Sequence, residues 1–125
     1  MGQALLVGPD LDVGRDAIAV LDEAGIDPAV ALLAAFPEYS DWRFVLASPA
    51  LDQKNLLRAH EQVAKAFRGE FVSRMPVTMV LRMKEPFVRA LRRSFSKAKN
   101  VEGMRLGGQT IGDRFVDSAY VYRIR

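Results

Sequence analysis

The stretch that decides the fold is residues 29–49, AVALLAAFPEYSDWRFVLASP. Two apolar runs flank the polar segment PEYSD at 37–41, and the second run opens with the only tryptophan of the chain. Apolar runs on either side of a short loop predict a β-hairpin. Since side chains alternate along a strand, one face of this hairpin would pair Phe36 with Trp42, Ala34 with Phe44 and Leu32 with Leu46.

Both faces of this predicted hairpin are apolar, because the opposite face carries mainly alanine, leucine and valine. A hairpin at the protein surface alternates apolar with polar residues, so this one is expected to be covered on both sides. A helix is the alternative for residues 29–35, because Asp27 could cap it, Pro28 suits its first position and AVALLAA favours helices. The strand is preferred because the next run, WRFVLAS, needs a neighbouring strand.

The composition indicates one compact domain spanning residues 1–125, since 50% of the 125 residues are hydrophobic. No apolar run reaches about 18 residues, so no membrane span is expected. The first residues, MGQALLVGPD, lack a basic start and a long apolar segment, which argues against a secretory signal. The absence of cysteine excludes disulfides, thiol catalysis and thiolate metal sites, and it favours a cytoplasmic location.

The net charge of +3 conceals a strong asymmetry. The first 52 residues contain nine acidic and two basic side chains, a net charge of −7, so the remaining residues carry +10. This split predicts a basic binding face, or two halves that attract each other within one chain or between copies. Opposite charges that alternate around a folded surface are the plainer explanation.

Periodicity predicts three helices and three further strands. The helices would cover residues 11–25, 52–67 and 85–100, and the strands residues 77–83, 104–111 and 115–124. Asp52 is the expected N-cap of the second helix, and a Gly112-Asp113 turn would join the last two strands. The expected fold is an α+β domain in two layers, with a mixed five-stranded sheet, three helices and the order α-β-β-α-β-α-β-β.

The later strands carry more specific expectations. Residues 77–83 are apolar on both faces, which suits an interior strand. In the final hairpin Thr110 would pair with Phe115, and the glycine pair at 107–108 would mark a bulge or a close backbone approach. Leu106 would pair with Ala119, and the opposite face of the last strand would carry Val116, Tyr120, Tyr122 and Ile124.

A homodimer is the expected assembly. Right-handed crossovers would place the second and third helices on the same face of the sheet, which leaves an apolar face uncovered. An uncovered apolar face in a small domain usually marks an interface. We therefore expect two copies to associate by sheet packing or by edge pairing.

Three segments carry a resemblance to known proteins: FPEYSDWRFVLASPALD at 36–52, VGRDAIAVLDEAGI at 13–26 and FVDSAYVYRIR at 115–125. Together they resemble a family of small, uncharacterised single-domain bacterial proteins. The resemblance implies a bacterial origin and supports a strand at residues 29–36. It implies no catalytic residue, ligand or partner, because none is attached to that family.

The third predicted helix is the best functional lead, as a surface for nucleic acid or for a partner. No acidic residue lies between Phe87 and Val101, and the basic residues fall mostly on the face away from the apolar stripe. Such a stripe can neutralise several phosphates, and an exposed Tyr120 or Tyr122 could stack on bases. A solvated helix face, or docking on the acidic half of another copy, are the alternatives. The basic residues are Arg89, Arg92, Arg93, Lys97 and Lys99.

Asp52 and Lys54 provide a weaker lead, because an acid, one spacer and a lysine resemble the lysine half of the PD-(D/E)xK nuclease signature. In such sites two acids hold Mg²⁺ or Mn²⁺, and the lysine positions or activates the attacking water. The second acid should lie on a neighbouring strand, but the nearest candidates, Asp27 and Asp41, do not. An N-cap role for Asp52 and a solvated Lys54 account for both residues.

His60, the only histidine, falls in the apolar stripe of the second predicted helix. It could act as a general base, but no nucleophile or partner acid lies at a useful spacing. We therefore expect a partly buried histidine that is hydrogen-bonded to the backbone or to a neighbour.

The sequence thus predicts a small cytoplasmic bacterial protein that is a non-enzymatic binding or protein-interaction module and forms homodimers. No cofactor, metal or membrane contact is expected, and no small-molecule ligand is indicated. The alternative is a nucleic-acid-associated protein that uses the basic helix Arg89 to Lys99, and a metal-dependent nuclease is a distant third.

Overall fold

The computed structural model describes residues 8–67, 75–98 and 100–125. The elements follow the predicted order, except that the second predicted helix is divided into a short helix, α2, and a longer one, α3. Their bounds are α1 (Gly8–Glu23), β1 (Val30–Ala35), β2 (Arg43–Ala47), α2 (Pro49–Asp52), α3 (Leu56–Ala66), β3 (Val77–Val80), α5 (Pro86–Ser94), β4 (Arg105–Ile111) and β5 (Arg114–Ile124).

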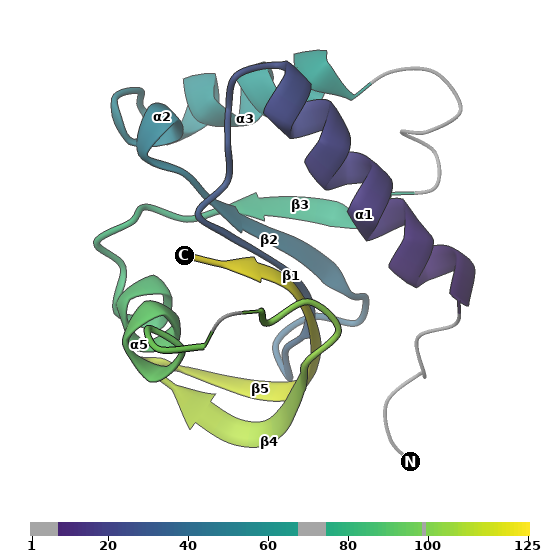
Figure 1. Ribbon diagram of the computed structural model, residues 1–125, viewed down its shortest axis with the longest axis vertical. Coiled ribbons are helices and arrows are strands. Elements are labelled where there is room, and N and C mark those ends of the chain that lie inside the picture. Colours follow the sequence, from purple (N-terminus) through teal and green to yellow (C-terminus); the bar gives the residue numbers. More distant parts are fainter. Residues whose placement is uncertain (1–7, 68–74, 99) are drawn as a thin grey trace.

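The described strands form one five-stranded sheet in the order β3-β2-β1-β5-β4. β2 and β3 are parallel, whereas the other neighbouring strands are antiparallel, so the predicted α+β class and mixed five-stranded sheet are confirmed. β1 is a strand and not the alternative helix, and it lies at the centre of the sheet. Figure 1 shows the sheet with α1 and α3 on one side and α5 on the other.

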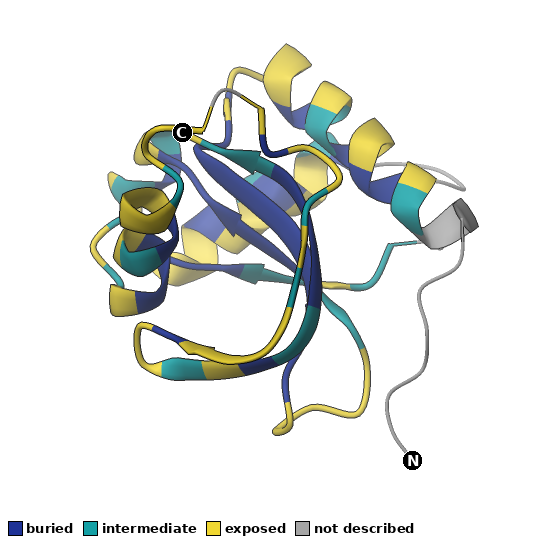
Figure 2. Cartoon of the chain, turned by 60° about the horizontal axis from the view of Figure 1, so that its bottom comes forward, coloured by how far each residue is buried: buried dark blue, intermediate teal, exposed yellow. Residues whose placement is uncertain are grey.

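Helices cover both faces of the sheet, where the sequence analysis expected them mostly on one. α5 leaves edge strand β3 and leads to β4 at the opposite edge, and the strand pairings make β4 antiparallel to β3. The right-handed rule governs connections between parallel strands only, so it does not place α5 beside α3. The uncovered apolar face on which the dimer expectation rested is therefore absent from the described chain, because α5 covers one face and α1 and α3 cover the other, as the buried strands in Figure 2 illustrate.

The central hairpin forms, but the predicted register is wrong by one residue. Ala34 pairs with Arg43, whereas the sequence analysis paired it with Phe44. A slip of one residue exchanges the two faces of β2, so Phe44 points toward α1 and α3 and Val45 points toward α5. Trp42 precedes β2 and packs on the side of α1 and α3, away from the position opposite Phe36 that was expected.

The final hairpin has the register that the sequence predicts. Thr110 pairs with Phe115 and Leu106 with Ala119. Gly112, the first residue of the turn, has a φ of 61°, a left-handed conformation that glycine adopts without the steric cost of a Cβ atom. The two-residue turn therefore determines the pairing of the two strands.

A β-bulge near the end of β5 changes the faces that its last residues occupy. Ala31 pairs with Arg123 and Leu32 with Val121, so the register shifts by one residue at Tyr122. Bulges redirect side chains, and this one turns Arg123 toward α1 and Ile124 toward the α5 side. The expectation that Val116, Tyr120, Tyr122 and Ile124 share one face is wrong, because both tyrosines pack on the α1 side and the other two pack with α5. The bulge accounts for the change between Tyr122 and Ile124.

β3 is a four-residue edge strand and not the interior strand that the sequence suggested. Met79 and Val80 pack against opposite core clusters, so both faces of β3 contact the core at its C-terminal end, whereas Val77 at its start is exposed. The N-cap of α3 is Asn55, whose Oδ1 accepts the Arg58 N–H at 2.9 Å, rather than Asp52. Asp52 ends α2 instead.

Candidate functional site

The outer face of α5 carries the basic residues that the sequence analysis identified. Arg89, Arg92 and Arg93 lie in the helix and Lys97 lies in the turn after it, and all four are exposed. The apolar residues of α5 are buried against the sheet, which directs these cations toward solvent. Lys99, the fifth predicted site residue, lies outside the described residues.

These cations have no acidic partner in the described part of the chain. Arg92 donates from Nε to the main-chain oxygen of Arg125 at 2.6 Å. Arg89 and Arg93 are one helical turn apart, so their charges lie on neighbouring positions of the same face. The outer face of α5 is thus a compact cluster of uncompensated positive charge.

Two other cations close to α5 in sequence are engaged elsewhere. Arg82 donates from Nη1 to the main-chain oxygen of Asp52 at 2.7 Å. The guanidinium of Arg105 lies 5.5 Å from the centre of the Tyr120 ring, within the range of a cation–π contact. Neither side chain extends the cluster on α5.

Part of the charge asymmetry is compensated within the molecule, an arrangement that the charge pattern of the sequence allowed. Two acids of the N-terminal half contact arginines at the C-terminal end: Asp22–Arg123 at 2.9 Å and Asp27–Arg125 at 2.8 Å. The Arg15–Glu102 pair, at 2.9 Å, runs in the opposite sense, because its base belongs to the acidic half. These pairs attach α1 and the segment after it to the end of β5 and to the chain that precedes β4.

The Asp22–Arg123 pair is bidentate, with both guanidinium Nη atoms donating to the carboxylate at 2.9 Å. These hydrogen bonds lower the pKa of Asp22 below its ordinary value and raise the pKa of Arg123, against the opposing effect of burial. Both groups are therefore held in their charged forms at neutral pH.

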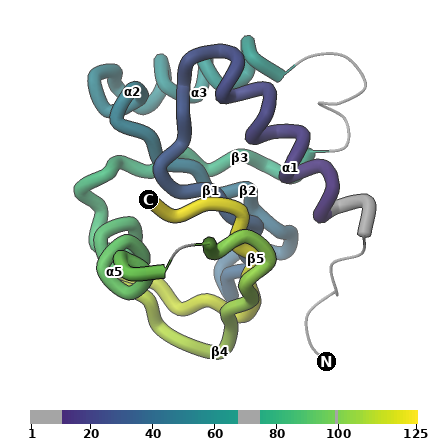
Figure 3. The backbone as a smooth tube through the Cα atoms, in the orientation of Figure 1, coloured from purple at the N-terminus to yellow at the C-terminus, as the bar shows by residue number. Residues whose placement is uncertain are grey.

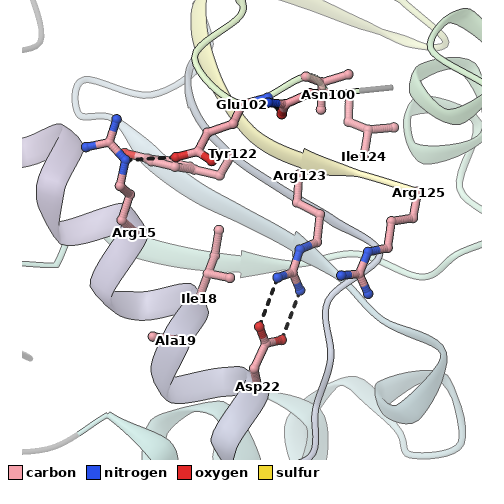
Figure 4. Close-up of a pocket in the computed structure, with 11 residues that line it drawn as sticks. Arg15, Ile18, Ala19, Asp22, Asn100, Glu102, Tyr122, Arg123, Ile124 and Arg125 are labelled. Carbon is pink, nitrogen blue, oxygen red and sulfur yellow. Dashed lines mark hydrogen bonds and ion pairs between the residues drawn. The ribbon is translucent and has the colours of Figure 1, made fainter. Parts of the chain in front are cut away.

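A cleft of about 440 Å³ opens beside these pairs, between α1, the residues around Val101 and the end of β5. Figure 4 shows side chains from all three regions around it. Ile18 and Ala19 contribute an apolar wall from α1, and Ile124 contributes from β5. The lining side chains include three arginines and two acids, so the cleft carries a small excess of positive charge.

The tyrosines proposed for base stacking are not available for it. Tyr120 and Tyr122 have exposed fractions of 7% and 6%, and both rings pack between the sheet and α1. The Tyr122 hydroxyl donates to the main-chain oxygen of Leu11 at 2.6 Å. A face of either ring is therefore not presented to a nucleic acid, and this part of the expectation is wrong.

The nuclease site is not assembled. The Asp52 carboxylate accepts the Met83 N–H at 3.1 Å, and Asp27 is held by Arg125. Lys54 is exposed, as expected for a solvated residue. Within the described ranges, no group of three or more histidine, cysteine or acidic side chains could hold a metal ion.

His60 is exposed, which corrects its placement in the apolar stripe of the helix. Its Nδ1 lies 2.9 Å from the main-chain oxygen of Leu56, and its Nε2 accepts the Val80 N–H at 3.3 Å. The expected hydrogen bonds to the backbone are thus present, and one of them occupies a donor at the free edge of β3.

The cleft is the feature that the sequence analysis missed. Its walls come from residues that are far apart in the chain, and no local spacing relates them: Arg15 and Glu102, for example, are 87 positions apart. Its shape also depends on the bulge at Tyr122, which no glycine or proline near that residue signals.

Comparison with known proteins assigns no relative: no protein-family model, no curated protein and no solved structure matches the chain. In the described part of the chain, no helix is long and apolar enough to span a membrane.

Proposed function

We propose that this protein is a cytoplasmic, non-enzymatic binding module that holds nucleic acid through the outer face of α5. The observation that carries the proposal is the contrast between two sets of cations. The arginines near the cleft are paired with acids, whereas Arg89, Arg93 and Lys97 are exposed and have no acidic partner among the described residues.

The arrangement of these cations favours a polyanionic ligand. Like charges three or four positions apart on a helix cost a few tenths of a kcal/mol each. The negative end of the helix dipole offsets this cost for Arg92 and Arg93, which lie in the last turn, but less for Arg89. A chain of phosphates would supply the missing counter-charge along the whole face.

Docking on the acidic half of another copy is less favoured. Asp22 and Asp27, which contribute to that acidic half, are already bound to Arg123 and Arg125 of the same chain. At these two acids, a partner copy would have to compete with the existing pairs. A nucleic acid presents its phosphates without such competition.

The proposed contact is to the backbone of the nucleic acid and not to its bases. α5 presents charged side chains but no aromatic residue on its outer face, and Tyr120 and Tyr122 are buried. Phosphate contacts position a protein without reading sequence. We therefore expect weak sequence preference and a steep dependence of affinity on salt.

The test is a fluorescence anisotropy titration of labelled duplex and single-stranded oligonucleotides at low and moderate salt. Arg89→Gln with Arg93→Gln should weaken binding and reduce the slope of log K against log salt by about 2 units, one for each phosphate that is no longer neutralised. Arg92 is left intact because it also bonds Arg125.

The matched control removes the same charge from α3 and its start, across the sheet from α5. Lys54→Gln with Arg58→Gln changes two exposed cations and should leave affinity within about twofold, as expected for surface charge outside the contact. Equal losses in the two variants would indicate a general charge effect and contradict the assignment to α5. Absence of binding at low salt would refute the proposed function itself.

A further inference from the structure

The cleft beside α1 has the size of a small-ligand site. Ile18 and Ala19 of α1 give it an apolar part, and charged and polar side chains from three separate regions line most of the rest. Its volume of about 440 Å³ lies within the range of about 300–1,000 Å³ that such pockets occupy. None of its lining residues belongs to α5.

Two groups at the edge of the cleft can donate hydrogen bonds to a ligand. Arg125 uses Nη1 for Asp27, and no described residue accepts from its Nε or Nη2; its side chain is 56% exposed. Asn100 uses Oδ1 to accept the Glu102 N–H at 3.0 Å, and its amide nitrogen has no hydrogen-bond partner in the described ranges. A guanidinium and an amide nitrogen together suit a phosphate or carboxylate group.

The other two arginines of the cleft form its walls and are not open to a ligand. Arg15 contacts Glu102, Asp12 and the Tyr120 hydroxyl. Arg123 is occupied by Asp22, and its side chain is only 18% exposed. The ligand-binding capacity therefore lies at the outer edge, at Arg125 and Asn100.

The cleft continues the basic face of α5. Arg92, on α5, donates to the main-chain oxygen of Arg125, which lines the cleft. The backbone trace in Figure 3 shows the end of β5 between α1 and α5, in agreement with this hydrogen bond and with the Asp22–Arg123 pair. A nucleic-acid strand that is bound along α5 would thus pass close to the cleft.

From this continuity we infer that the cleft receives one nucleotide of the bound nucleic acid, with its phosphate on Arg125 and Asn100. The base would lie against the apolar side chains of Ile18 and Ala19 on α1. This inference rests on the proposed function. It also specifies the ligand class: a base that enters the cleft must be unstacked, so single-stranded segments or ends are preferred over continuous duplex.

The test uses mononucleotides, which are too small to span α5 and the cleft together. Binding of adenosine and uridine monophosphate is measured by isothermal titration calorimetry. Ala19→Trp fills the cleft from the exposed side of α1, and Asn100→Asp keeps the acceptor for Glu102 but replaces the amide donor with a negative oxygen. Each change should weaken mononucleotide binding at least tenfold.

Two controls separate the cleft from the fold and from α5. Ala24→Trp makes the same change at an exposed residue that does not line the cleft, and it should leave mononucleotide binding unchanged. Arg89→Gln with Arg93→Gln should weaken binding of oligonucleotides but not of mononucleotides. Circular dichroism confirms that each variant is folded.

The possible outcomes distinguish the two proposals. Failure of the wild-type protein to bind mononucleotides at millimolar concentration, or equal binding by the Ala19→Trp variant, would overturn the cleft assignment and leave the α5 result standing. Mononucleotide binding that depends on the cleft, without oligonucleotide binding through α5, would refute the proposed function and retain the cleft as a nucleotide site.

Discussion

Asp22 and Arg123 form a bidentate ion pair that joins α1 to the end of β5. The hydrogen bonds from Arg123 lower the pKa of Asp22 in the folded protein. A carboxyl group whose pKa falls on folding adds stability above its unfolded pKa, about 3.9, and this contribution is lost as the pH falls from there through the folded value. The contribution of Asp22 is therefore fully present at pH 7.

Asp22→Asn should reduce the free energy of unfolding at pH 7 by about 0.5–1 kcal/mol, the upper range for a partly exposed pair with good geometry. The side chain of Asp22 is 39% exposed, so solvent screening limits the effect. The difference between the variant and the wild-type protein should shrink as the pH falls below about 3.9. Urea denaturation at neutral and acidic pH measures both quantities.

The control for Asp22→Asn is Asp41→Asn. Asp41 is exposed and takes part in no ion pair among the described residues. Its substitution should change the stability at pH 7 by less than about 0.5 kcal/mol. A loss in the Asp22 variant of the same size at both pH values would show that Asp22 acts through packing and not through charge.

The role of Asp52 does not follow from the local sequence. The stretch around it contains several residues that can cap a helix, and Asp52 is the cap that the sequence predicts. In the structure Ser48 caps the short helix α2, which ends at Asp52, and Asn55 caps α3. The Asp52 carboxylate instead accepts the N–H of Met83, 31 positions away, a contact that helix-capping preference alone does not predict.

At the scale of elements, the approach of α1 to β5 depends on Gly14. A Cβ atom on Gly14 would lie 2.1 Å from Cζ of Tyr122, far inside contact distance. In an exposed helix, replacing glycine by alanine stabilises by about 1 kcal/mol. Here Gly14→Ala should instead destabilise the protein by about 1–3 kcal/mol, because the ring or the helix must move.

Denaturation of Gly14→Ala, alone and combined with Tyr122→Leu, tests this contact. Leucine lacks the outer ring atoms that the new methyl group would meet, so the alanine should cost much less in the Tyr122→Leu background. If Gly14→Ala stabilises the wild-type protein, α1 does not lie against Tyr122 as described.

The two hairpins show which elements the sequence could specify. A two-residue turn with glycine first has one favoured geometry, and the predicted register around Gly112 is confirmed. The longer loop between β1 and β2 imposes no such geometry, and there the register was wrong by one residue. Gly107 was expected at a close backbone approach, and a Cβ atom there would lie 2.8 Å from the main-chain oxygen of Asp117.

The candidate site also has one part that the sequence could predict and one part that it could not. The basic face of α5 follows from helical periodicity within one segment, so its exposed residues could be predicted. The cleft could not be predicted, because Arg15, Asn100 and Arg125 come together only through the packing of α1 on β5. It depends on contacts between distant parts of the chain and on one β-bulge, and neither has a local sequence signal.

For the whole molecule, the central question is whether the protein associates with itself. The dimer expectation assumed an apolar sheet face without a cover, but α5 covers one face and α1 and α3 cover the other. Sheet packing between copies thus has no free apolar face in the described chain. Edge pairing along β3 or β4 is the remaining route.

Both edges carry features that oppose such pairing. At β3, His60 accepts the N–H group of Val80, and just beyond the strand Asp52 accepts the N–H group of Met83. At β4, Gly108 has a φ of 62°, which interrupts the extended backbone that a second strand would need. We therefore expect a monomer of 13.9 kDa rather than the dimer predicted from the sequence.

Sedimentation velocity over a range of micromolar concentrations checks this expectation, since a stable interface buries about 800 Å² on each partner and would be evident as a second species. The large apolar side chains that remain exposed are few: Leu56 and Leu57 adjoin at the start of α3, and Tyr39, Val77 and Phe115 lie on other segments, which argues against a surface of that size. A dimer that persists at low micromolar concentration would contradict the prediction. Such a dimer would form by edge pairing. Thr110→Lys would place like charges on the exposed edge strand β4 of both copies, so this substitution should dissociate the dimer.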